Sequence, residues 1–142
     1  MKKEQEQIRE FMVKAGQDTP ARPVMPNADV RKLRVKLIAE ELCELAESFG
    51  FDIEILNGEV NVFSNGATTN LTESYDAILD LLVVTIGAGV AIGTDLEPGW
   101  QEVHRSNMSK FIDGHRREDG KWVKGPSYSP AQLAPIIEAQ LK

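Results

Sequence analysis

Two long apolar segments with helical spacing constrain the fold most, because each carries carboxylates where leucine would be expected. The first is predicted as a helix from about Asp29 to Phe49, with apolar side chains recurring every three or four residues on one broad arc. Glu41 and Glu44 fall inside that arc. A carboxylate pointed into an apolar core is unfavourable unless a cation or a hydrogen-bond donor meets it. Two neighbouring carboxylates therefore need a shared positive partner.

The second segment repeats this pattern. Asp80 interrupts an otherwise apolar stretch from Ile78 to Ile86, and Asp76 and Glu73 lie one and two turns earlier. Two such helices that face each other would hold a hard cation, Mg²⁺ or also Mn²⁺, through oxygen ligands. Neither helix contains histidine, which disfavours a di-iron protein because its sites include Glu-x-x-His pairs. For Glu47 and the outer acids, an ordinary solvated helix face is the simpler interpretation.

The remaining pattern predicts an all-α protein, a four-to-five-helix bundle with a small inserted β-hairpin at about 52–63. Helices are expected at about 4–15, 29–49, 70–92 and 95–111, with a last helix starting near Ser129, although Pro135 makes that start uncertain. Asp29, Asn70 and Asp95 are the predicted N-caps. The hairpin surrounds Asn57-Gly58, and because a lone hairpin is marginal it must pack on the bundle or on a partner subunit. We expect one domain, 1–142, with a basic loop and the last helix in about 113–142.

Charge and cysteine content exclude several classes of protein. A net charge of −6 argues against a protein that binds nucleic acid polymers, but it permits a nucleotide bound through a metal. The single cysteine, Cys43, rules out an intramolecular disulfide and fits the reducing cytoplasm. The segment from Met1 to Glu10 is too charged for a secretion signal. The longest apolar run, about Ile78 to Ile92, is shorter than the ~20 residues that span a bilayer. We therefore expect a cytoplasmic protein with no membrane partner.

A second set of polar residues follows the acidic helices. Asn107 and Lys110 share one face of the predicted fourth helix, and Lys121 and Lys124 lie in a locally basic stretch. Such residues suit a polyphosphate bridged by metal. A solvated helix end and an ordinary surface loop explain the same pattern equally well.

Taken in order, these stretches resemble the all-α nucleoside triphosphate pyrophosphatase superfamily, which includes MazG proteins, dimeric dUTPases and phosphoribosyl-ATP pyrophosphatases. Glu41-Leu42-Cys43-Glu44 matches its Glu-x-x-Glu motif, and Asp80 matches the Asp of its Glu-x-x-Asp motif. Asn107-Met108-Ser109-Lys110 and Asp119-Gly120-Lys121 are similar to MazG-like members. The resemblance covers about Phe11 to Ala134. Ala77 stands where the superfamily places Glu, and we infer that Asp76, on the same helical face, replaces it; Glu73 and Asp76 as the pair would leave Asp80 without a role.

The resemblance implies Mg²⁺-dependent hydrolysis of a nucleoside triphosphate between its α and β phosphates. Under it, Glu41, Glu44, Asp76 and Asp80 are the metal ligands and Glu40 is the general base. The substrate-binding residues are Asn107, for sugar or base, and Lys110, Lys121 and Lys124, for phosphate. Because a second subunit commonly completes the site in this superfamily, we expect a homodimer or homotetramer. The alternatives are a phosphoribosyl-ATP pyrophosphatase, a non-catalytic helical oligomer that binds nucleotide and metal, and a structural bundle whose acids are all solvated.

Overall fold

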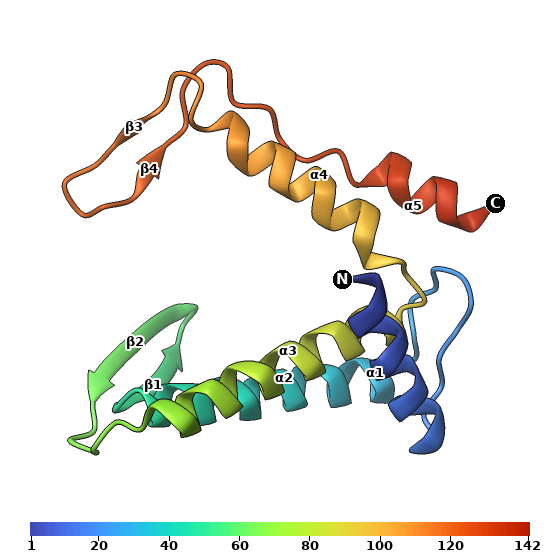
Figure 1. Ribbon diagram of the computed structural model, residues 1–142, viewed down its shortest axis with the longest axis horizontal. Coiled ribbons are helices and arrows are strands. Elements are labelled where there is room, and N and C mark those ends of the chain that lie inside the picture. Colours follow the sequence, from blue (N-terminus) through green and yellow to red (C-terminus); the bar gives the residue numbers. More distant parts are fainter.

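The computed structural model describes residues 1–142 and confirms a mostly helical chain with an inserted hairpin (Figure 1). The helices are α1 (Lys2–Lys14), α2 (Ala28–Ser48), α3 (Leu71–Ala91), α4 (Leu96–Ser109) and α5 (Ala134–Leu141). Strands β1 (Phe51–Leu56) and β2 (Glu59–Ser64) form one antiparallel hairpin, and β3 (His115–Arg116) and β4 (Trp122–Val123) form a much shorter one.

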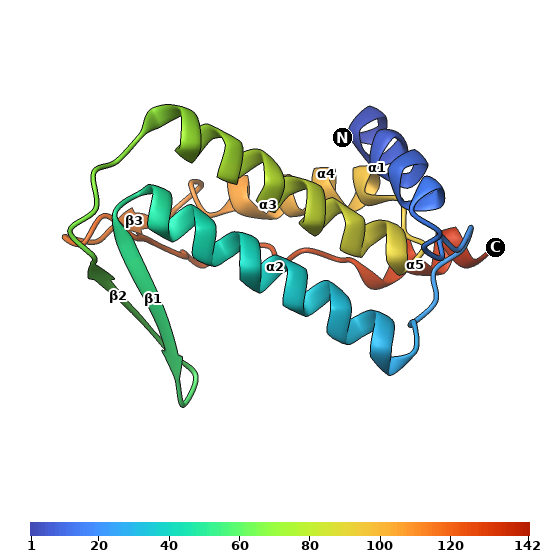
Figure 2. The same cartoon turned by 90° about the horizontal axis from the view of Figure 1, so that it is seen from below.

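The antiparallel pair of α2 and α3 forms the body of the molecule (Figure 2). Small side chains allow the two helices to approach closely near the hairpin end, where Ala46, Ser74 and Ala77 are buried. The Ser74 hydroxyl donates a hydrogen bond of 3.1 Å to the carbonyl oxygen of Ser48. This contact brings the acidic half of α2 beside the acidic half of α3.

The hydrophobic core lies at the opposite end, where α1 packs against the last turns of α3. Met12 and Val90 are its most completely buried large side chains. Its other members come from the same two helices, with one residue each from α2 and α4 packed against them: Ile8, Ile86, Ala91, Val30 and Leu96. Only 16 of the 142 residues are buried, so this core is small for the length of the chain.

Residues 96–142, which we call the C-terminal arm, extend away from the α2–α3 pair (Figure 1). Within the arm, α4 packs on α1 and has little contact with α2 or α3. Arg105 ties α4 to the returning chain through hydrogen bonds to the Ser129 hydroxyl at 3.0 Å and the Pro130 carbonyl at 3.1 Å. Trp122 packs on Phe111, with ring centroids 4.8 Å apart, and anchors the β3–β4 hairpin.

The structure corrects three local predictions. Asn27, not Asp29, caps α2, because its side-chain oxygen accepts a hydrogen bond from the Val30 amide. Ser129 does not start the last helix; it is held by Arg105 and Ser109, and α5 begins at Ala134 with Pro135 in its first turn, where proline is tolerated. The segment expected to be irregular contains β3 and β4. The Asn70 and Asp95 caps and the Asn57-Gly58 turn are confirmed.

The helix α3 is longer than its apolar run suggested. At 21 residues it is long and apolar enough to cross a membrane by length and composition. It packs along α2 and α1, and it carries Asp76 and Asp80, which are unfavourable in lipid. These features favour the helix as a core element of the bundle.

Candidate metal and nucleotide site

A strongly acidic pocket lies between α2, α3 and the loop that precedes α3. Its carboxylates come from both helices: Glu44, Glu47, Glu73, Asp76 and Asp80. Ser48, Ala67, Thr68 and Ala77 complete the lining, and no lysine or arginine contributes. Its volume of about 480 Å³ lies within the range of small-molecule sites. The pocket therefore joins Glu44 to Asp80, as the sequence predicted, and adds Glu47 and Glu73.

Glu41 lies beside this pocket in a half-buried position. Burial raises the pKa of its carboxyl group, and the nearby carboxylates of Glu44, Asp80 and Glu40 raise it further. None of the four predicted ligands, Glu41, Glu44, Asp76 and Asp80, forms an ion pair or accepts a side-chain hydrogen bond within the chain. The four negative charges are thus left without a positive partner, which is the condition that a bound divalent cation relieves.

The donor set fits a hard cation that retains part of its water shell. No three Asp, Glu, His or Cys side chains in this structure lie close enough to enclose a metal ion. Mg²⁺ does not need such a cage, because it binds through one or two carboxylates and takes further oxygens from water and phosphate. The identity of the ligands remains a prediction, with Asp80 the most central because it also lines two neighbouring hollows.

One of these hollows is apolar and lies between α1, α2 and α3. It has a volume of about 310 Å³ and joins Glu41 and Asp80 to Phe11, Met12, Leu37 and Val84. Arg34 lies in its wall and donates to the side-chain oxygen of Gln17. The Arg34 Nε atom is buried without a hydrogen-bond partner, and burial lowers the pKa of the guanidinium.

The sequence analysis did not predict this apolar hollow. The available signal was the position of Arg34, seven residues before Glu41 and so on the same face of α2. At 1.5 Å per residue, that spacing is about 10 Å along the helix. The hollow thus offers an apolar slot with a polar end beside the carboxylates.

The other predicted site residues lie outside both the acidic pocket and the apolar hollow. Glu40 is exposed, lines neither hollow and pairs with Lys36 at 3.2 Å. Asn107 and Lys110 are on α4 and bind each other at 2.7 Å, and the Lys124 ammonium lies 4.1 Å above the Tyr128 ring. Lys121 is exposed in the β3–β4 turn region. Within one chain, the structure does not bring these cations to the acidic pocket.

The alanine at position 77 has a structural explanation. Ala77 is only 7% exposed at the contact between α2 and α3. The small side chain permits that contact, while Asp76 on the adjacent position lines the acidic pocket. This placement is compatible with Asp76 as the second-motif carboxylate, which stays a prediction.

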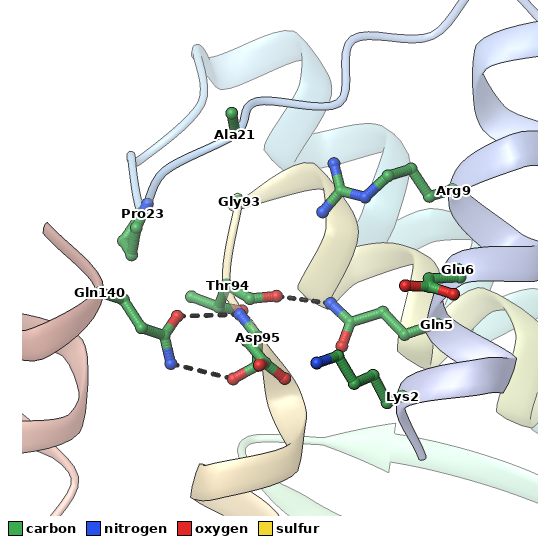
Figure 3. A pocket seen from close by; sticks show the side chains of 10 residues that line it. All are labelled: Lys2, Gln5, Glu6, Arg9, Ala21, Pro23, Gly93, Thr94, Asp95 and Gln140. Atoms are coloured by element: carbon green, nitrogen blue, oxygen red, sulfur yellow. Dashed lines mark hydrogen bonds between the residues drawn. The ribbon is translucent and has the colours of Figure 1, made fainter.

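A different, polar pocket of about 270 Å³ lies at the junction of α1, α3, α4 and α5 (Figure 3). Its polar groups bind one another: Gln5 donates to the Thr94 carbonyl, and Gln140 accepts from the Asp95 amide at 2.8 Å and donates to the Asp95 carbonyl at 3.0 Å. Gln5 also accepts from the Leu96 amide at 3.0 Å. These bonds hold the α3–α4 turn in place, so we assign this pocket a structural role.

An acidic pair of helices in a mostly helical fold is the arrangement that the resemblance to the all-α nucleoside triphosphate pyrophosphatase superfamily predicts. Within it, the sequence model of the family described as phosphoribosyl-ATP pyrophosphohydrolase matches residues 8–107, more than two thirds of the chain. The chain belongs to this family and is a hydrolase acting on phosphoric anhydrides. The match spans every acidic residue of the pocket and Asn107, but not Lys110, Lys121 or Lys124. A search of curated proteins finds no match to this chain.

Proposed function

We propose that the chain is a phosphoribosyl-ATP pyrophosphohydrolase, which releases pyrophosphate by hydrolysing the α–β phosphate bond of the adenosine triphosphate part. The family match supports this alternative better than the general nucleoside triphosphate pyrophosphohydrolase that the resemblance first suggested. The observation that carries the proposal is the pocket of five carboxylates without a cation, shared by the two helices that the family match covers.

In this proposal the carboxylates of Glu41, Glu44, Asp76 and Asp80 hold Mg²⁺ or Mn²⁺, which supplies charge neutralisation to the phosphates. Glu40 is the predicted base that takes the proton of the attacking water. Because Glu40 pairs with Lys36 outside the pocket, Glu47 inside the pocket is the residue to compare with it. Arg34 and Gln17 form the polar end of the apolar hollow, which suits the nucleoside part of the substrate.

We further propose that a second copy supplies the missing cations, so that the enzyme is a homodimer or homotetramer. The chain exposes 10124 Å². A compact monomer of 15.7 kDa is expected to expose about 7,300 Å², so about 2,800 Å² is in excess. Two copies that each bury this excess would remove about 5,600 Å² in total, at the upper end of the range for obligate homodimers. In the assembly, Lys110, Lys121, Lys124 and Asn107 of one copy would face the acidic pocket of the other. We also propose a cytoplasmic location, on the ground that a chain with one cysteine forms no intramolecular disulfide.

The direct test is pyrophosphate release in the presence of Mg²⁺ from phosphoribosyl-ATP and from a panel of ribo- and deoxyribonucleoside triphosphates. We expect pyrophosphate and not orthophosphate, with phosphoribosyl-ATP the preferred substrate. Asp80→Asn and Glu44→Gln should each lower kcat/KM by at least the roughly 10- to 100-fold that loss of a residue orienting a metal ligand causes, because here a ligand itself is lost. Glu138→Gln, on exposed α5, is the matched control and should be neutral. A panel without pyrophosphate from any substrate would contradict the proposal.

Glu40→Gln and Glu47→Gln identify the base in the same assay. Loss of a general base lowers kcat by about 10²- to 10⁴-fold, so of these two substitutions the one that removes the base should give the larger loss of kcat. If Glu47→Gln gives the larger loss, the assignment of Glu40 is wrong and that of the pocket stands.

A general nucleoside triphosphate pyrophosphohydrolase is the second candidate. It is favoured by the segment from Asn107 to Lys110 and the basic stretch after it, which resemble MazG-like members and lie almost wholly beyond the matched residues. Faster turnover of a nucleoside triphosphate than of phosphoribosyl-ATP would select this candidate.

A further inference from the structure

The β1–β2 hairpin has one apolar face and one acidic face. Its register pairs Ile53 with Val62 and Ile55 with Val60, so these four side chains share one face with Phe51. The opposite face carries the hairpin's acids, Asp52, Glu54 and Glu59, together with Asn61, Leu56 and Phe63. No lysine or arginine occurs between residues 51 and 64. The two faces therefore differ both in polarity and in charge.

The apolar face is uncovered in the single chain. Ile55 is 65% exposed, Val60 63% and Val62 57%. Among the helices, only α2 packs closely on the hairpin, through its C-terminal end. The two strands project beyond that end of α2 (Figure 2). A two-stranded hairpin is at best marginally stable in water by itself. Its stable form therefore needs a surface that covers these aliphatic side chains.

Surface area and charge together indicate what covers the face. The excess of about 2,800 Å² over a compact monomer of this mass calls for a second copy of the chain. Stacking of two hairpins by their apolar faces, as in sheet-on-sheet packing, leaves the acidic faces outside and apart. Edge-to-edge pairing would instead place six carboxylates on one sheet face and leave the aliphatic side chains in water. Charge thus favours stacking over edge pairing.

We infer that the β1–β2 hairpin is an oligomerisation arm, whose apolar face stacks on the same face of the hairpin of a second copy. Five side chains are too few for a standard interface of about 800 Å² per partner. The hairpin contact consequently adds to a larger contact between helices. The inference requires an assembly of copies but is independent of which nucleotide is hydrolysed.

Cysteine cross-linking tests the stacked arrangement. In a Cys43→Ser background, Val62→Cys places a thiol on the apolar face and Asn61→Cys places one on the opposite face of the same strand. With a short bis-maleimide at low micromolar protein, we expect covalent dimers from Val62→Cys and few from Asn61→Cys. Equal yields from the two variants, or no dimer from Val62→Cys, would overturn the inference.

A charge substitution tests how much the β1–β2 hairpin contributes to association. Val60→Lys and Asn61→Lys introduce the same charge on adjacent residues of opposite faces. By sedimentation velocity, Val60→Lys should weaken self-association at least about tenfold, as loss of a well-packed contact does, and Asn61→Lys should not. Far-ultraviolet circular dichroism checks that both variants keep their helices. Identical sedimentation of the two variants would refute a role of the β1–β2 hairpin in association. Pyrophosphate release by either variant would leave the proposed function intact.

Discussion

At the scale of single residues, the uncompensated charge of Glu41 makes a direct prediction about stability. Because burial and neighbouring carboxylates raise its pKa in the folded state, the folded protein binds the proton more tightly than the unfolded chain does. Stability therefore falls as pH rises through the ordinary and then the raised pKa of this group, and the ionised carboxylate destabilises the fold above that range. Glu41→Gln should raise the unfolding temperature at pH 7 without Mg²⁺ and reduce the further rise that Mg²⁺ gives the wild type.

The control for Glu41→Gln is Glu10→Gln, an exposed α1 residue that pairs with Lys14 at 2.6 Å. It should leave the Mg²⁺ effect unchanged. Thermal unfolding at pH 7 and pH 4, at one protein concentration, measures both effects. A Glu41→Gln variant less stable than the wild type at pH 7 without metal would contradict this account.

The pKa of Glu102 shifts in the opposite direction, downward. Its two oxygens accept from Arg105 at 2.7 Å, and one also accepts from the Gln132 amide at 2.8 Å. These bonds lower the pKa of the carboxyl group to about 2, with Arg105 the main cause. The stability it contributes is present above pH 4.5 and is lost as pH falls toward 2. In Glu102→Gln, hydrogen exchange at the Gln132 amide should quicken at pH 7, and the difference from the wild type should shrink below pH 4. An equal difference at pH 7 and pH 3 would contradict the role of this charge.

At the scale of elements, the turn between α3 and α4 depends on Gly93. Its φ is +70°, and a Cβ added there would lie 2.1 Å from the Arg22 carbonyl oxygen. Gly16 has the same φ of +70° with no neighbour within 4 Å. Gly16→Ala should therefore lower the free energy of unfolding only by the penalty for a left-handed alanine, about 1–2 kcal/mol. Gly93→Ala should cost clearly more, because the 20–24 connector must move; urea unfolding measures both. Equal losses would show that the connector accommodates the methyl group.

The elements also show what could be predicted from sequence. Apolar periodicity was sufficient for α2 and α3, and Asn57-Gly58 for the hairpin turn, because those signals are local. The start of α5 and the β3–β4 pairing were missed, since they depend on contacts between distant residues, such as Arg105 with Ser129 and Phe111 with Trp122. For the same reason, the hollow beside Arg34 could not be predicted, because three separate helices build its wall.

At the scale of the whole molecule, the acidic pocket and the lysines of the C-terminal arm lie on different parts of one chain. Complementation between two inactive variants tests whether the arm of a second copy reaches the pocket. Glu44→Gln removes a pocket carboxylate, and Lys110→Ala removes a cation of the C-terminal arm. If each site combines the pocket of one copy with the arm of the other, a mixed dimer contains one site with both changes and one unaltered site. Random equal mixing makes half of the dimers mixed, so the activity should recover to about a quarter of the wild-type value.

If the pocket and the arm of the same chain formed each site, every site in the mixture would carry one change, and activity would stay at the level of the separate variants. Mixing before and after a brief exposure to mild denaturant separates subunit exchange from simple addition of residual activities. The matched control is Glu44→Gln mixed with Asp80→Asn: both changes fall in the same pocket, so no mixed dimer contains an unaltered site. Recovery in that control would contradict the shared-site arrangement, because it could not come from a pocket and an arm contributed by different copies.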